Sequence, residues 1–186
     1  MGETVFDDPR LNDLVLLPFT DPSLRTKPEE FDFINPQINA TDLVAALTQA
    51  MLKLGGVGLS ANQVGLPYRV FVYGVNGSYT PVFNPKIIGA SKETTIFKEG
   101  CLSAPGVWLM LKRPTVVVVS YCDVNGAPAD LELSGISSRV FQHEYDHMEG
   151  RNFTQLASAL KLQRALATLK KKVHHAEKLR AADAIA

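Results

Sequence analysis

One stretch, Gln142–Gly150, constrains this chain more than any other part of it. It reads Q-H-E-Y-D-H-M-E-G and contains the pattern H-E-x-x-H. On a helix, His143 and His147 lie about one turn apart on the same face, so both imidazoles can bind a single metal ion. Glu144, beside the first histidine, can accept a proton from an attacking water molecule. The pattern therefore predicts a metal-binding helix. The alternative is a surface helix that carries two histidines by chance.

Length, charge and cysteine content bound the class of protein. The chain has 186 residues, enough to bury a sizeable core, and we expect one domain over residues 1–186. Its net charge is zero, which does not favour specific DNA binding. No apolar run approaches the roughly 20 residues that span a bilayer, so no membrane contact is expected. Only two cysteines, together with no signal peptide at residues 1–6, predict a reducing, cytoplasmic location.

Hydrophobic periodicity predicts helices at both ends of a strand-rich middle. Thr41 is a candidate N-cap for a first helix that Gly55 is well placed to end. The apolar stripe of this helix comprises Leu43, Leu47, Met51 and Leu54. Short runs rich in Val, Ile, Phe and Tyr follow, of which Thr115–Cys122 is the strongest strand, with Leu131–Leu133 as its hairpin partner. The H-E-x-x-H helix is expected at about Ile136–Glu149.

The last part of the chain, at about residues 155–182, is expected to form a basic helix. Its predicted apolar stripe comprises Leu162, Leu166, Leu169, Val173 and Ala176, and its basic residues are Lys161, Arg164, Lys170, Lys171, Lys172, Lys178 and Arg180. Such a face is usually just solvated, but it can also meet an anionic partner such as RNA. We expect an α+β fold, in which small antiparallel β-sheets would pack around the central H-E-x-x-H helix and the C-terminal helix would lie outside.

A second segment, Gly55–Gly65, is dense in glycine. It lacks the G-K-[ST] of a phosphate-binding loop and the third glycine of a dinucleotide-binding motif. Glycines in this number allow the backbone to pass close to a neighbouring group, with the side-chain amide of Gln63 presented at the end of the segment. A plain glycine-rich connector is the alternative interpretation.

Two histidines leave a catalytic tetrahedral site one protein ligand short. In H-E-x-x-H proteases of the metzincin type the third ligand is a later histidine, but Phe153 stands at that position here. In those of the gluzincin type it is a later glutamate, and Glu177, in the basic terminal segment, is a poor candidate. Cys101 is a better one, because a thiolate is a soft ligand suited to iron or zinc and the neighbouring Gly100 allows close backbone approach.

Three motifs taken together resemble the peptide deformylase family. That family shows G-Φ-G-Φ-A-A-x-Q, E-G-C-Φ-S and H-E-Φ-D-H, where Φ is apolar. This chain has G-V-G-L-S-A-N-Q at Gly56–Gln63, E-G-C-L-S at Glu99–Ser103 and H-E-Y-D-H at His143–His147. The resemblance covers about residues 14–160. It implies removal of the formyl group from formyl-methionyl nascent peptides, with release of formate.

The resemblance also implies a site. Cys101, His143 and His147 would hold one divalent metal ion, typically Fe2+, with Zn2+, Ni2+ or Co2+ able to replace it. Glu144 would carry the proton, and the Gln63 side-chain amide and the Leu102 backbone N–H would stabilise the oxyanion. Asp146 is expected to hold a metal ligand or a nearby arginine in position.

The implied substrate is an extended formyl-methionyl peptide. Val57, Gly58 and Gly100 offer it backbone partners. The pocket expected to receive the methionine side chain is formed by apolar residues, each of which is also a plausible core residue: Val57, Phe97, Ile136 and Val140.

The chain also departs from the family pattern. Ser60 replaces an alanine, Tyr145 an aliphatic residue, Arg139 an apolar pocket residue, and Trp108 stands where many bacterial members carry an arginine. The last two differences, Arg139 and Trp108, concern the shape of the pocket and leave the metal chemistry intact. The basic terminal helix resembles that of bacterial members that dock at the ribosome, which makes ribosome contact a hypothesis. Two rival functions are a metalloprotease that cuts internal peptide bonds and a catalytically silent binding protein of the same fold.

Overall fold

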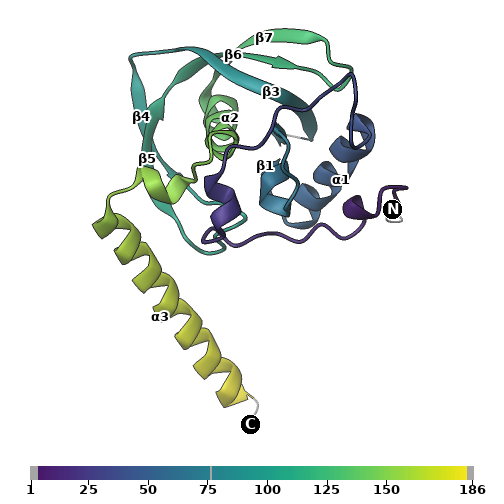
Figure 1. Cartoon of the computed structure of the whole chain (residues 1–186). Helices are drawn as coiled ribbons and strands as arrows, with labels where there is room; N and C mark the ends of the chain where they lie inside the picture. The colour runs from purple at the N-terminus through teal and green to yellow at the C-terminus, as the bar shows by residue number, and fades with distance from the viewer. Residues whose placement is uncertain (1–3, 76, 184–186) are drawn as a thin grey trace.

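The computed structural model of the chain describes residues 4–75 and 77–183 (Figure 1). Its α-helices are α1 (Ala40–Lys53), α2 (Gly135–Met148) and α3 (Ala159–Asp183). Its strands are β1 (Gly58–Ser60), β2 (Val70–Val75), β3 (Ser78–Ala90), β4 (Thr94–Glu99), β5 (Leu109–Pro114), β6 (Val116–Cys122) and β7 (Pro128–Ser134). Short 3-10 helices are η1 (Pro9–Leu11), η2 (Pro22–Arg25), η3 (Ala61–Val64) and η4 (Phe153–Leu156).

The strands form two antiparallel sheets. The larger sheet has the order β1-β2-β3-β6-β7, and the smaller one pairs β4 with β5. In Figure 1, α2 lies at the centre of the body with strands on several sides of it, and α3 extends away from that body. The predicted α+β fold, with small antiparallel sheets around the H-E-x-x-H helix, is confirmed.

Three apolar clusters hold these elements together. The first lies between α1 and the β1–β2 end of the large sheet and includes Leu43, Leu47 and Met51. The second joins α2 to the large sheet, where the rings of Phe71 and Phe141 meet edge to face with centroids 5.1 Å apart. Full burial of each such side chain stabilises the fold by roughly 2 kcal/mol, which makes α2 a rigid support for the side chains on its other face.

The structure corrects the predicted start of the first helix. Asn39, not Thr41, is the N-cap, because its side-chain oxygen accepts hydrogen bonds from the backbone N–H groups of Thr41 and Asp42 at 2.9 and 3.1 Å. Gly55 ends this helix with a φ of 69°, the left-handed conformation expected of it. The β6–β7 hairpin is also as predicted.

The predicted single helix over residues 155–182 is wrong at its start. Gln155 belongs to η4, since its side chain accepts from the backbone N–H of Asn152 while the Asn152 side chain accepts from the N–H of Thr154. The long helix α3 begins only at Ala159.

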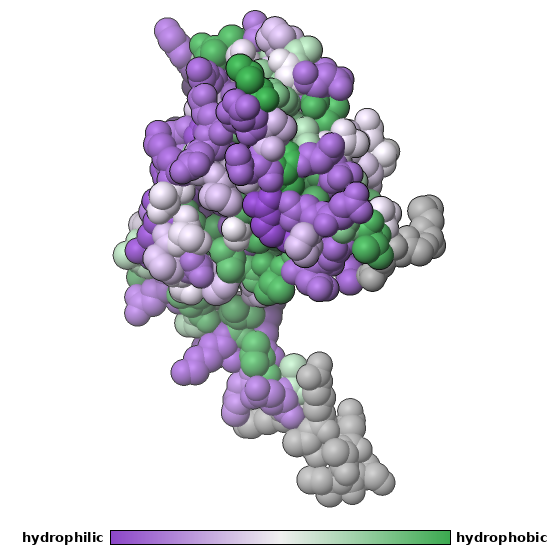
Figure 2. Space-filling view, turned by 45° about the vertical axis from the view of Figure 1, so that its right-hand side comes forward, coloured by the Kyte–Doolittle hydropathy of each residue, from purple (hydrophilic) through white to green (hydrophobic). Residues whose placement is uncertain are grey.

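The predicted apolar stripe of α3 is only partly buried. Leu162 and Leu169 pack, with Ala165, against the third apolar cluster, around Val107 and Leu109 on and beside β5. Leu166 and Val173 are exposed instead, by 37% and 48%. Figure 2 shows α3 as a narrow extension of the rounded body. The side chains of Lys178 and Arg180, predicted to be part of its basic face, lie outside the described residues. No helix among the described residues is long and apolar enough to cross a membrane.

Candidate metal centre and catalytic cleft

The structure brings Cys101, His143 and His147 together. Cys101 follows β4, and the two histidines stand one turn apart on α2. One ligand atom from each of the three residues lies within 4.8 Å of the others, and Cys101 Sγ is 3.5 Å from His147 Nε2. A thiolate and two imidazoles at this separation form a donor set that suits a divalent transition-metal ion and leaves a fourth position open. The residues therefore fit such an ion.

The orientation of the two histidine rings also suits metal binding. His143 Nδ1 lies 3.1 Å from Glu99 Oε2, so its other ring nitrogen, Nε2, is the one that can bind an ion. His147 is fully buried, its Nε2 faces Cys101, and its Nδ1 has no hydrogen-bond partner among the described residues. At the nitrogens that face the candidate metal position, the contacts that the two imidazoles make are with Cys101, itself a candidate ligand.

The pKa values of His143 and His147 are shifted by burial and by the groups beside them. Burial lowers the pKa of His143, but hydrogen bonds to Cys101 and Glu99 outweigh this effect and raise it to about 10. Burial and the neighbouring charge of His143 hold the pKa of His147 well below its ordinary value. Without metal at neutral pH, His143 thus retains a proton, while His147 is neutral and ready to act as a ligand.

A buried ion-pair network supports His143 from behind. Glu99 accepts from Arg113 at 2.7 and 2.8 Å and from Arg139 at 2.9 Å. Burial alone would raise the pKa of Glu99, but the hydrogen bonds from His143, Arg113 and Arg139 hold it well below its usual range. Asp146 accepts from the other end of the Arg113 guanidinium at 2.8 Å. Asp146 therefore contacts a nearby arginine, one of the two arrangements expected for it.

The sequence alone does not predict these contacts of Glu99 and Arg113. For Glu99, in E-G-C-L-S, the available signal is a carboxylate two residues before a candidate metal ligand. Arg113 carries no comparable signal, because its partners come from β4 and α2, far from it in the chain.

Glu144 lies against the glycine segment. Its Oε2 accepts a hydrogen bond from Ser60 Oγ at 2.6 Å, and a side chain at Gly58 would collide with its other carboxylate oxygen. Burial raises the pKa of Glu144, an effect that the charge of His143 and the Ser60 hydrogen bond partly offset. A raised pKa suits a group that must take up and return a proton near neutral pH.

Gln63 presents its side-chain amide to the same centre. Its Oε1 accepts from the Ser60 backbone N–H at 3.0 Å, which fixes the orientation of the amide. Its Nε2 then donates toward Cys101 Sγ at 3.3 Å and to Ser103 Oγ at 3.0 Å. The glycine segment is thus more than a connector, since it passes beside Glu144 and ends in an amide aimed at the candidate metal ligands.

One cleft of about 580 Å³ lies beside these groups. Every predicted catalytic, metal and substrate residue lines it except His147, which lies behind: Val57, Gly58, Gln63, Phe97, Gly100, Cys101, Leu102, Ile136, Val140, His143 and Glu144. Val57, Phe97 and Ile136 are about half exposed, whereas Val140 is buried. Exposed apolar side chains in a concave site are free to contact a ligand, so the first three are more than core residues.

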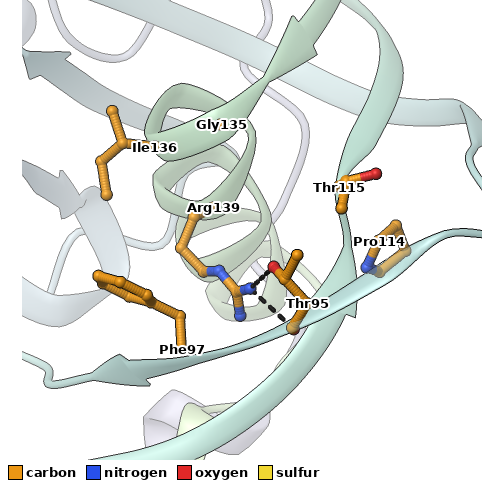
Figure 3. A pocket seen from close by; sticks show the side chains of 7 residues that line it. All are labelled: Thr95, Phe97, Pro114, Thr115, Gly135, Ile136 and Arg139. Atoms are coloured by element: carbon orange, nitrogen blue, oxygen red, sulfur yellow. Dashed lines mark hydrogen bonds between the residues drawn. The ribbon is translucent and has the colours of Figure 1, made fainter.

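The residues that depart from the expected pattern lie in different places. Trp108 lines the cleft, 53% exposed, with Lys98 Nζ 4.8 Å from its ring centroid. Arg139 also lines the cleft, and it lines a second, smaller cavity as well (Figure 3). Tyr145 stacks on Phe141 and packs against the second apolar cluster, so it does not line the cleft. Phe153, at the position of a later histidine ligand, is buried with its ring centroid 5.7 Å from that of His143.

Comparison with known proteins agrees with this geometry. The family model described as "Polypeptide deformylase" matches residues 14–163. A peptide deformylase of Treponema pallidum is 40% identical over 130 residues, which cover 70% of this chain and 79% of the relative. A solved peptide deformylase of Synechococcus elongatus, in complex with actinonin, superposes with a TM-score of 0.77 at 33% identity, covering 84% of this chain and 88% of that one. One of Arabidopsis thaliana gives 0.75 at 35% identity, covering 86% and 92%. The chain belongs to the polypeptide deformylase family.

Proposed function

We propose that this chain hydrolyses the N-terminal formamide bond of formyl-methionyl nascent peptides, releasing formate and a free amine. The observation that carries the proposal is the convergence of three soft-to-borderline metal ligands, one buried carboxylate and one oriented amide on a single cleft. No observation favours an internal-bond protease or a silent binding protein. Phe153 is buried where a protease of the metzincin type has its third ligand, and a silent protein has no need of Glu144.

Cys101, His143 and His147 would hold one divalent ion, and we propose ferrous iron, with zinc, nickel or cobalt as substitutes. The mixed thiolate and imidazole set supports this choice, since both ligand types bind iron and zinc. When bound, such an ion polarises the formyl oxygen and lowers the pKa of water toward about 7.

Glu144 would accept the proton of the attacking water and later deliver it to the departing amine. The hydrogen bond from Ser60 holds one carboxylate oxygen, and the absence of a side chain at Gly58 leaves room for the other. A positioned proton carrier of this kind contributes about 10²- to 10⁴-fold in rate.

The oxyanion that develops on the formyl oxygen requires hydrogen-bond donors. We propose the Gln63 amide, already oriented by Ser60, and the backbone N–H of Leu102, the residue next to Cys101. The loss of one such donor typically costs about 3 kcal/mol of barrier.

The peptide would run along the exposed end of the cleft as an added strand, with Val57, Gly58 and Gly100 as backbone partners. Its methionine side chain would enter between Phe97, Ile136 and Val140, whose apolar surfaces suit a thioether.

Nascent peptides also suggest a location and a partner. We propose a cytoplasmic enzyme that contacts the ribosome through α3, whose exposed basic residues include Lys161, Arg164, Lys170, Lys171 and Lys172. Contact with RNA predicts binding that weakens steeply as salt rises. Replacement of Lys170, Lys171 and Lys172 by glutamate should abolish co-sedimentation with ribosomes, while formate release from a free tripeptide is unchanged. Salt-insensitive binding would refute the contact.

The function itself is tested with formyl-Met-Ala-Ser and acetyl-Met-Ala-Ser, with mass spectrometry of the products. We expect loss of the formyl group alone, and at most trace hydrolysis of the acetyl peptide. Cleavage of an internal peptide bond in either substrate would instead establish a protease.

A further inference from the structure

A second, smaller cavity of about 260 Å³ adjoins the catalytic cleft (Figure 3). Three of the residues that line it, Phe97, Ile136 and Arg139, also line the cleft. Beyond them the small cavity is bounded by Thr95, Pro114 and Thr115, which do not line the cleft. The three shared side chains therefore form the partition between the two spaces.

Arg139 is the polar member of this partition. Its side chain extends from α2 toward β4, with Ile136 and Phe97 on one side of it and Pro114 and Thr115 on the other (Figure 3). It is only 7% exposed, although the neighbouring walls are largely apolar. A guanidinium next to a pocket for a thioether is chemically unexpected, so its position requires a reason.

The guanidinium is held from several directions. Its Nη1 donates to Glu99 Oε1 at 2.9 Å and to the Leu111 carbonyl at 3.0 Å. Its Nη2 donates to the Thr95 carbonyl at 3.0 Å and to Thr95 Oγ1 at 2.8 Å. Swinging Arg139 aside would break these bonds and leave Glu99 with one buried cation fewer, whereas Phe97 and Ile136 are about half exposed and have no such anchor.

We propose that Arg139 is a specificity-determining residue that closes the far end of the pocket for the first side chain of the peptide. This inference rests on the proposed function and adds a limit to it. The anchored guanidinium prevents a long side chain from passing into the small cavity, so the enzyme accepts side chains up to about the length of methionine and rejects longer ones.

The unaltered enzyme provides the first test. Formyl-Xaa-Ala-Ser peptides are compared in which Xaa has an unbranched side chain of three, four, six or eight carbons. Each added methylene favours binding until the wall is reached, after which kcat/KM should fall by about tenfold or more between the four- and six-carbon side chains. A kcat/KM that continues to rise with length would overturn the proposal, because the pocket would then be open.

The second test removes the wall. In Arg139→Leu the two cavities join, and the ratio of kcat/KM for the six-carbon to the four-carbon side chain should rise about tenfold or more. Arg139→Lys retains a long cationic side chain and should keep most of the wild-type preference. Arg151→Leu is the matched control, because Arg151 also pairs with the buried network, through Asp146 at 3.2 Å, but lines neither cavity. Its ratio should remain within about twofold of wild type.

The outcomes separate this inference from the proposed function. If no enzyme form releases formate from the methionine peptide, the proposed function fails. If all forms release it and Arg139→Leu shows the wild-type length preference, the proposed function stands and the role of Arg139 is refuted. Should Arg139→Leu fail to fold, the length series on the unaltered enzyme still decides between a closed and an open pocket.

Discussion

The helices α2 and α3 differ in which side chains they bury and which they expose to solvent. In α2 a run of polar side chains is buried: Ser138, Arg139, Gln142, His143, Glu144, Asp146 and His147. In α3 apolar side chains are exposed: Leu160, Leu166 and Val173. The difference lies in what surrounds each helix. Buried polar groups of α2 find partners on β1, β4, β5 and the segments that follow them. In α3, the side chains that pack against the body come from the first half of the helix, at Leu162, Ala165 and Leu169.

Burial of so many polar side chains lowers the stability of the fold unless each has a hydrogen-bond or ion-pair partner. Here the same hydrogen bonds and ion pairs also hold the side chains of the candidate site in position. The ion pairs of Glu99 hold the carboxylate that contacts His143, and the hydrogen bond from Ser60 holds one oxygen of Glu144. The comparison therefore predicts large losses of activity or stability when a hydrogen-bond or ion-pair partner of a buried α2 side chain is removed. It predicts small losses for substitutions on α3.

The largest expected effect is on catalysis. Glu144→Gln should lower kcat by about 10³-fold or more, because glutamine cannot accept the proton of the attacking water. The metal content, measured by elemental analysis, should stay at that of the wild type, since Glu144 is not a ligand. A variant that keeps most of its kcat would show that another group carries the proton.

The next effect is on stability. Arg113→Met removes the cation shared by two buried carboxylates, Glu99 and Asp146, and should lower the free energy of unfolding by about 3–5 kcal/mol. Urea unfolding in the presence of a chelator measures this without the contribution of bound metal. A loss below about 1 kcal/mol would mean that water, rather than protein, satisfies the two carboxylates.

A third prediction concerns pH. Since the pKa of His143 is raised to about 10, metal-free His143 carries a proton at neutral pH that an incoming ion must displace. Affinity for Co2+ or Zn2+ should therefore rise about tenfold per pH unit between pH 6 and 8, and fall by the same factor as pH drops. Equilibrium titration with a competing chelator measures this slope, and a flat profile would contradict a protonated His143.

The smallest effects are expected on α3. Leu166→Ala should change the free energy of unfolding by less than about 0.5 kcal/mol, because this side chain is already exposed. Leu169→Ala should cost about 1 kcal/mol, since Leu169 packs on the third apolar cluster. Thermal unfolding of the two variants gives the comparison, and equal losses would show that the whole stripe is covered in solution.

The same contrast explains what the sequence could predict. The spacing of His143 and His147 and the soft chemistry of Cys101 identified residues that the structure brings together, because helix geometry and ligand type are local properties. The partners of Arg139 could not be foreseen, because its hydrogen bonds join α2 to β4 and β5 across the fold. The exposure of Leu166 and Val173 was also missed, because an apolar stripe indicates which face of a helix can be buried but not how far the covering surface extends.

The central claim is that one ion held by Cys101, His143 and His147 drives formate release in this cleft. The most direct measurement titrates the anaerobically prepared metal-free protein with Fe2+ and follows formate release from formyl-Met-Ala-Ser against iron bound per chain. The account predicts activity that rises linearly, stops at one ion per chain, and is absent in Cys101→Ala at the same iron concentration. Release by the metal-free protein, or full activity in Cys101→Ala, would contradict it.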